Sequence, residues 1–183
     1  MASLLYSLLL AQPIFLSMFQ SSKKKSYTPG EALQKIAAFC AYQERNFKEV
    51  EAKLRDYGLD EDEAGEIIIK LSREKLLDEE RYAKSFVRGK FRQKKWGRRR
   101  IQQELKQKGL SEYCIKAGMK EIDGDEYYQN LVDLLEKKDA QEKERHPAKR
   151  RQKLTQFLTL KGYESDLIRM AMDDLGKEPG EED

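Results

Sequence analysis

Apolar residues recur at helical spacing through most of the chain, in three successive series of three segments each. The first segment carries a stripe at positions three and four apart, formed by Leu33, Ile36, Ala37 and Cys40. The third series opens with a similar stripe at Tyr128, Leu131 and Leu135. Such positions share one face of a helix, and the charged residues between them lie on the other face. No stretch alternates strictly enough to predict a strand, so the pattern predicts an all-helical protein.

Residues that favour helix starts stand at the heads of these segments. Thr28, Pro29 and Glu31 make a capping box with proline at the first helical position, and Asp60 with Glu63 repeats the box two segments later. Further starts are predicted at Asn46, Asp78, Ser111 and Pro147. We therefore expect a succession of short, separately capped helices.

A repeated pattern marks the second helix of each series. It reads Val50-x3-Leu54-x3-Gly58, then Ile101-x3-Leu105-x3-Gly109, then Leu154-x3-Leu158-x3-Gly162. Glycine commonly ends helices because it adopts the left-handed backbone conformation at low cost. A period of about fifty residues with matched ends indicates tandem repeats, and units this small must pack against their neighbours.

The predicted fold is all-α, with three tandem three-helix repeats that form an elongated, curved array. The expected limits are 28–77 for repeat 1, 78–122 for repeat 2 and 123–175 for repeat 3.

The two ends of the chain are expected to lie outside this array. Residues 1–27 are apolar and then rich in Lys and Ser, but no cation precedes the apolar run and Pro13 divides it, which is unlike a signal peptide. Met18 would then be the native start, and the alternative is a membrane-associated leader. Residues 176–183 are acidic with Gly and Pro, and we expect them to be disordered.

Charge is distributed unevenly along the chain. Lys and Arg number 36 against 33 Asp and Glu, so the net charge of +3 says little about partners. The run from Arg88 to Arg100, however, contains eight cations and no acid. Such a run repels itself unless an anionic surface meets it, and DNA phosphates or an acidic protein groove are the usual candidates. The alternative is a solvated helix face, although such faces usually intersperse acids.

Helical geometry separates the cations of the second repeat. If Ile101 and Leu105 face the core, Arg99 and Lys106 point away from it, whereas Arg98 lies at the core edge and is expected to lay its stem over it.

Other features of the basic region are weaker. Trp96 is expected to pack as a hydrophobic staple rather than to stack on a base. A second basic patch recurs in repeat 3, at Lys149, Arg150, Arg151 and Lys153. The corresponding helix of repeat 1 mixes both signs of charge.

The motifs of common enzymes and metal sites are missing from the sequence. It contains no phosphate-binding glycine loop, no HExxH and no zinc-spaced Cys or His set. Its one histidine, His146, precedes Pro147 and is expected to serve a surface or capping role. Cys40 and Cys114 lie far apart within helical patterns, as reduced, packed thiols do. We predict a binding protein with no catalytic residue, no metal and no cofactor.

Two stretches of the middle repeat carry a family resemblance. One runs from Asp78 to Val87 and pairs an acidic start with Arg81, Tyr82 and Ala83. The other runs from Gly97 to Leu110 and reads Arg-Ile-x-x-Glu-Leu-x-x-Lys-Gly. At this spacing they resemble the RecX family, and the weaker outer repeats extend the resemblance over about residues 30–175.

The resemblance implies a bacterial, cytoplasmic regulator that binds the RecA recombinase filament on DNA, lies in its groove and restrains ATP hydrolysis, strand exchange and SOS induction. It implies no catalytic residue and no membrane partner. We expect a monomer whose own binding to DNA is weak and non-specific. The residues expected to contact RecA or DNA are Arg88, Lys90, Arg92, Lys94, Lys95, Arg99, Arg100 and Lys106, assisted by Lys149 and Lys153.

Two alternatives to this function stay open. One is a free-standing DNA-binding module, because a helix pair with a basic second helix also describes a helix-turn-helix. The other is a scaffold whose basic run serves solubility.

Overall fold

The computed structural model describes residues 26–175, which form nine α-helices and no strand. The first triplet comprises α1 (Pro29–Tyr42), α2 (Phe47–Asp56) and α3 (Glu61–Arg73). The second comprises α4 (Glu79–Lys94), α5 (Arg98–Gln107) and α6 (Glu112–Met119). The third comprises α7 (Gly124–Gln141), α8 (Pro147–Lys161) and α9 (Ser165–Leu175).

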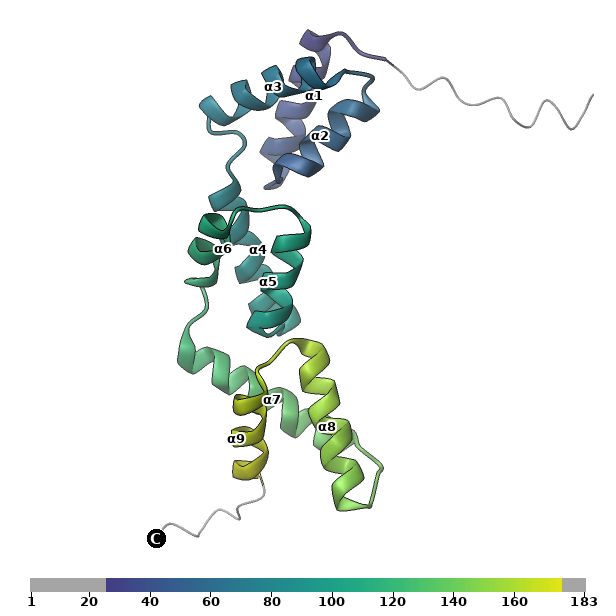
Figure 1. Cartoon of the computed structure of the whole chain (residues 1–183), viewed down its shortest axis with the longest axis vertical. Coiled ribbons are helices and arrows are strands. Elements are labelled where there is room, and N and C mark those ends of the chain that lie inside the picture. Colours follow the sequence, from purple (N-terminus) through teal and green to yellow (C-terminus); the bar gives the residue numbers. More distant parts are fainter. Residues whose placement is uncertain (1–25, 176–183) are drawn as a thin grey trace, which may run out of the picture.

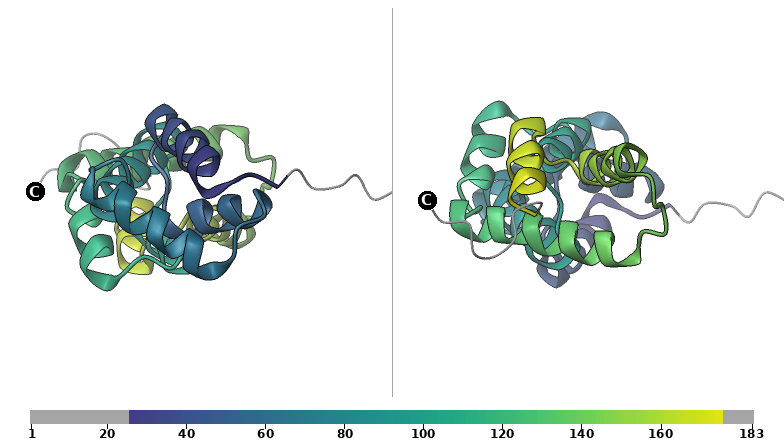
Figure 2. Two further views of the ribbon diagram at one scale, coloured as in Figure 1. Left: turned by 90° about the horizontal axis from the view of Figure 1, so that it is seen from above. Right: turned by 90° about the horizontal axis from the view of Figure 1, so that it is seen from below.

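The triplets are stacked along the long axis, from α1–α3 at the top of Figure 1 to α7–α9 at the bottom. Seen along that axis, they lie over one another (Figure 2). The predicted all-helical, elongated array of three-helix units is thereby confirmed. The expectations for residues 1–25 and 176–183 lie outside the described residues.

The helix ends follow the local signals in the sequence. The Thr28 hydroxyl accepts a bond from the N–H of Glu31, whose carboxylate accepts one from the N–H of Thr28 at 2.9 Å, and Asp60 and Glu63 form the same box. The side chains of Asn46, Asp78 and Ser111 also cap their helices as predicted. The predicted stop glycines all have left-handed φ angles, which are 91° at Gly58, 83° at Gly109 and 95° at Gly162.

The described chain has two apolar cores rather than three. The first triplet encloses its own core, whereas the second and third triplets share one. Rings of Phe91, Tyr127 and Tyr163 carry the shared core across the joint, with centroids 6.1 Å and 5.0 Å apart along the series. Tyr128, which the periodic pattern places on the inward face, packs only partly buried against the shared core. Tyr127 is the buried residue, and the Tyr128 hydroxyl donates to Asp174 near the surface at 2.9 Å.

The joint between the second and third triplets is a direct contact of backbones. Gly97, the N-cap of α5, donates its N–H to the carbonyl of Lys161 at 2.8 Å, and the N–H of Arg99 donates to Gly162 at 3.1 Å. A Cβ added at Gly97 would lie 2.2 Å from the carbonyl carbon of Gly162. Only glycine therefore allows the start of α5 to meet the end of α8 in this way.

The joint between the first and second triplets is made by side chains. Asn46 is the N-cap of α2, the position that Gly97 holds before α5. The contacts here are Arg81 with Glu44 at 2.6 Å, Lys108 with Glu49 at 3.0 Å, and the Tyr82 hydroxyl with Glu49 at 3.4 Å. Partly exposed ion pairs contribute little stability in water. The first triplet is therefore held to the rest less firmly than the other two are held together.

Replacement of Gly97 by alanine tests the backbone contact. Gly97→Ala is expected to lower the free energy of unfolding by about 1–3 kcal/mol, because the new methyl group overpacks the joint. Urea denaturation followed by circular dichroism measures the change. The control is Gly65→Ala on α3, where an added Cβ meets nothing within 4 Å, and which should gain about 0.5–1 kcal/mol. A similar response of both variants would contradict the proposed constraint.

Candidate functional site

The basic run lies on the second half of α4, on its connection to α5 and on the first turn of α5. The chain reverses after Lys94 because Lys95 adopts a left-handed conformation with φ of 51°. Trp96 is half-buried against the shared core, as expected of a staple. The ammonium of Lys90 lies 4.9 Å and the guanidinium of Arg100 3.9 Å from the Trp96 ring. The ring thus positions two of the predicted site residues.

Side chains of α7 and of the segment before it bond three of the positively charged residues in the run. The pairs are Arg88 with Glu121 at 2.9 Å, Arg92 with Glu126 at 3.9 Å, and the ammonium of Lys95 with the side-chain oxygen of Asn130. The run holds no acid in sequence, yet packing brings two carboxylates to it. The expectation of an uncompensated run is therefore wrong for Arg88 and Arg92.

Six cations of the run have no acidic partner within residues 26–175. Two of them are engaged otherwise, because Lys95 bonds the Asn130 amide and Arg98 lies over the Tyr127 ring; the other four are Lys90, Lys94, Arg99 and Arg100. Lys94 and Arg99 are exposed and have no ion pair there. Lys90 contacts only aromatic rings, and Arg100 contacts the Trp96 ring and the carbonyl of Leu160 at 3.3 Å. These four residues therefore concentrate the available positive charge around the α4–α5 connection.

Of the outlying candidates, two are engaged in ion pairs. Lys106 pairs with Glu112 at 2.9 Å, and Lys153 lies 3.2 Å from Glu142. The backbone N–H of Glu144 and the ammonium of Lys153 lower the pKa of Glu142 to about 2, so this carboxylate is ionised at neutral pH.

The basic patch on α8 is partly structural. Arg150 donates to the Asp139 carboxylate at 2.7 Å and to backbone carbonyls of the α7–α8 connection, and Arg151 pairs with Asp173 at 2.7 Å. Lys149 is exposed and has no ion pair in the described range.

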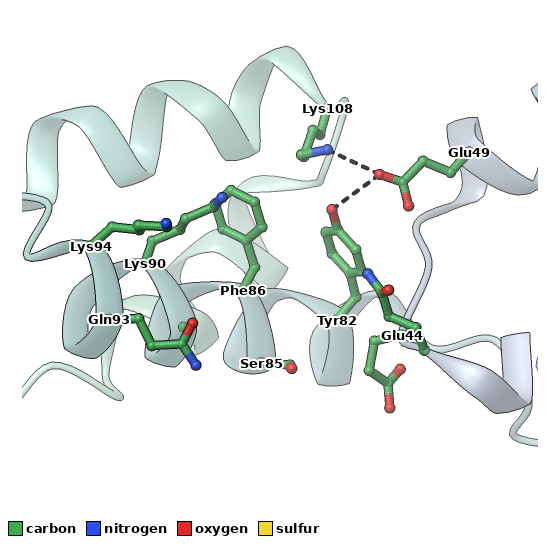
Figure 3. Close-up of a pocket in the computed structure, with 11 residues that line it drawn as sticks. Glu44, Glu49, Tyr82, Ser85, Phe86, Lys90, Gln93, Lys94 and Lys108 are labelled. Atoms are coloured by element: carbon green, nitrogen blue, oxygen red, sulfur yellow. Dashed lines mark hydrogen bonds and ion pairs between the residues drawn. The ribbon is translucent and has the colours of Figure 1, made fainter.

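A groove of about 350 Å³ lies between α4 and the first triplet. Figure 3 shows Lys90 and Lys94 along α4, Lys108 reaching over from the end of α5, and Glu49 opposite it. Lys90 and Lys108 lie 5.1 Å and 5.7 Å from the Phe86 ring. The groove thus combines three ammonium groups with an aromatic wall, a combination suited to an anion that carries a flat ring.

Lys108 is not among the contact residues predicted from the sequence, although it is the Lys of the Lys-Gly pair that ends the second family stretch. Its burial disfavours the charged form, but hydrogen bonds to Glu49 and Tyr82 outweigh burial and raise the pKa of Lys108. It therefore stays protonated. The Glu49 carboxylate accepts both the ammonium and the Tyr82 hydroxyl, so it holds Lys108 at the rim of the groove.

The part of the chain in the structure shows no constellation of metal ligands. No three His, Cys, Asp or Glu residues between positions 26 and 175 are placed to hold a metal ion. His146 is exposed, and Cys40 and Cys114 are buried free thiols. None of the described helices combines the length and apolar character needed to span a bilayer.

Comparisons with known proteins bear on the same triplets. The model of the second three-helix domain of RecX matches residues 78–119, and that of the third matches residues 125–172. Regulatory protein RecX of Oceanobacillus iheyensis is 33% identical over 135 residues, which are 73% of this chain and 49% of that protein. The Enterococcus faecalis protein of the same name is 30% identical over 160 residues, 87% of this chain and 59% of that protein. The chain thus spans about half to three fifths of these relatives.

Solved structures agree with these matches. The crystal structure of RecX from Lactobacillus salivarius superimposes with a TM-score of 0.73 at 27% identity and covers 80% of this chain and 96% of its own. A second crystal structure, of a regulatory protein RecX, gives the same TM-score and identity over 79% of this chain and 71% of its own.

The electrostatic character of the groove can be tested with Glu49→Gln. Loss of this carboxylate is expected to tighten the binding of a fluorescent single-stranded oligonucleotide about twofold. The reason is that Glu49 repels a phosphate, and the repulsion between two unit charges about 10 Å apart in water corresponds to about that factor. Fluorescence anisotropy measures the affinity. Glu51→Gln on the same helix removes an equal charge away from the groove, where Glu51 pairs with Arg55. If the two variants bind the oligonucleotide equally, the groove is not the contact.

Proposed function

Because the chain belongs to the RecX family, we propose that it is a cytoplasmic regulatory protein that binds the RecA recombinase filament on DNA and restrains its ATPase, its strand exchange and its induction of the SOS response. The proposal concerns the residues of this chain, which covers only part of its curated relatives.

The observation that carries the proposal is the cluster of unpaired cations on the second triplet. Lys94 and Arg99 are exposed and have no ion pair among the described residues, and they flank the α4–α5 connection together with Lys90 and Arg100. Cations that contact phosphates release counterions, which gives affinity without sequence preference. A regulator that follows a filament along any DNA sequence requires that kind of contact.

Architecture supports the same proposal. The second and third triplets share one core and meet through backbone bonds, so they present their surface as one body. Stacked helical units give an extended surface suited to a long partner. A filament groove, where protein and phosphate are both exposed along a repeating path, is such a partner.

The predicted contact residues separate into two groups. Lys90, Lys94, Arg99 and Arg100 are the primary contacts, with Lys149 available on α8. Arg88, Arg92, Lys95, Lys106 and Lys153 would first have to leave their present partners. Four of these five residues make partly exposed ion pairs, which are weak enough for that exchange, whereas Lys95 would have to leave the buried Asn130 amide. All five are therefore assigned a secondary contribution.

The position of α5 weighs against a free-standing helix-turn-helix. In that motif the N-terminal residues of the second helix reach into the major groove. Here the N–H groups of Gly97 and Arg99 are bonded to the end of α8. Mobility-shift assays without recombinase separate the two functions, since tight and sequence-selective duplex binding would favour the DNA-binding module.

The double variant Lys94→Glu/Arg99→Glu tests the assigned contact in a recombinase ATPase assay on single-stranded DNA. The concentration for half-inhibition is expected to rise about tenfold at moderate salt, because two phosphate contacts are lost. For the same reason, the plot of the logarithm of the binding constant against the logarithm of the salt concentration should become less steep by about 1.5. The control is Lys137→Glu/Lys143→Glu, which makes the same charge change at exposed residues without described ion pairs.

The two possible failures of this experiment differ. Equal inhibition by both double variants would reject the residue assignment and leave the regulatory function in place. Absence of inhibition by the unmodified protein, at any ratio to recombinase, would reject the function itself.

A further inference from the structure

A second groove lies between α5 and α6 and shares no lining residue with the groove along α4. It encloses about 550 Å³. The lining residues are Arg98, Arg99 and Gln102 of α5, Ile115, Lys116 and Met119 of α6, the C-cap residue Lys120 that follows α6, and Glu164. Of these, only Arg99 is among the contact residues that the sequence predicts.

The rim of this α5–α6 groove is positively charged and lacks acidic partners in the described chain. Arg99, Lys116 and Lys120 are exposed and make no ion pair with any residue between 26 and 175. Arg98 lies with its guanidinium 4.0 Å from the Tyr127 ring and makes no ion pair there either. The one lining carboxylate, Glu164, already accepts the Tyr127 hydroxyl at 2.6 Å. The rim therefore favours an anionic occupant.

The floor of the α5–α6 groove is apolar. Met119 is half-buried where it packs against the shared core, and Ile115 beneath it is only 1% exposed. An occupant gains from this floor only if it carries an apolar group. Single-stranded nucleic acid would offer its bases, but bases bind by stacking on aromatic rings, and none of the lining side chains is aromatic. The phosphates of a duplex would leave the floor uncovered.

We propose that the α5–α6 groove is a docking site for a protein segment in which one apolar side chain is flanked by Asp or Glu residues. The apolar side chain covers Met119, and the carboxylates meet Arg99, Lys116 and Lys120. Anchors of this kind, set in a pocket and surrounded by complementary charge, dominate many protein interfaces. The inference goes beyond the proposed function, because it assigns a protein contact to a groove that shares only Arg99 with the proposed filament contact, and it does not depend on the identity of the partner.

Nuclear magnetic resonance of the ¹⁵N-labelled full chain tests the assignment with defined probes. The first probe is a blocked peptide with a central Phe and two Asp on either side, and the second has Ser in place of Phe. Amide signals of Lys116, Met119 and Lys120 are expected to shift with the Phe peptide, which should bind about fivefold more tightly than the Ser peptide because it buries a ring. Equal affinities, or shifts confined to the groove at Phe86 and Lys90, would overturn the proposal.

Variants separate charge from apolar contact. Lys116→Glu/Lys120→Glu should weaken both peptides at least tenfold, while Lys137→Glu/Lys143→Glu, with the same change in net charge, should change their binding less than twofold. Met119→Gln keeps the size of the side chain and should abolish the preference for the Phe peptide. If Met119→Gln fails to fold, the charge variants alone decide the outcome, since Lys116 and Lys120 are exposed.

A short oligothymidylate serves as the competing probe. It is expected to shift the amide signals of α4 and to leave those of Met119 and Lys120 unchanged. Tighter binding of the oligothymidylate than of the Phe peptide in the α5–α6 groove would make this a nucleic-acid site and overturn the proposal. These titrations contain neither recombinase nor ATP, so their failure is distinguishable from failure of the proposed function.

Discussion

The approach of the backbones at Gly97 and Gly162 determines which parts of the chain form one body. The first N–H groups and the last carbonyls of any helix lack partners within that helix. At this joint the start of α5 and the end of α8 satisfy each other directly, through bonds of 2.8 Å and 3.1 Å. The close approach also brings Phe91, Tyr127 and Tyr163 into one continuous ring series. Two residues without side chains, Gly97 and Gly162, thus permit two triplets to share a core.

The first joint shows what happens when the same unit lacks this contact. Asn46 replaces glycine at the N-cap and uses its side chain to cap its own helix, by accepting from the N–H of Glu49 at 2.8 Å. The stem of Lys48 covers Gly109, the glycine that corresponds to Gly162. Side chains therefore separate the backbones, and the joint consists of partly exposed ionic contacts. The repeats are alike in fold but unlike in how firmly they are connected.

Local features were predictable from the sequence, because caps and glycine ends act over a few residues. Thr28, Asp60 and the three stop glycines all have the conformations that their neighbours predict. Charge compensation was not predictable, since Arg88 and Glu121 are 33 residues apart and meet only after α4 packs beside the segment that precedes α7. The periodic pattern also failed to choose between Tyr127 and Tyr128. Neighbouring aromatic residues on a helix fit the same apolar stripe almost equally well.

The candidate site was only partly predictable for the same reason. Lys94 and Arg99 belong to an evident basic run, whereas Lys108, Lys116 and Lys120 acquire their role from the grooves on which they lie. Lys108 also connects the site to the weaker joint, because its ammonium is held by Glu49 of the first triplet. Any anion that binds Lys108 must compete with Glu49 for that ammonium. Thermodynamic linkage makes the two effects equal. Binding of the anion weakens the attachment of the first triplet by the same free energy by which that attachment weakens the binding of the anion.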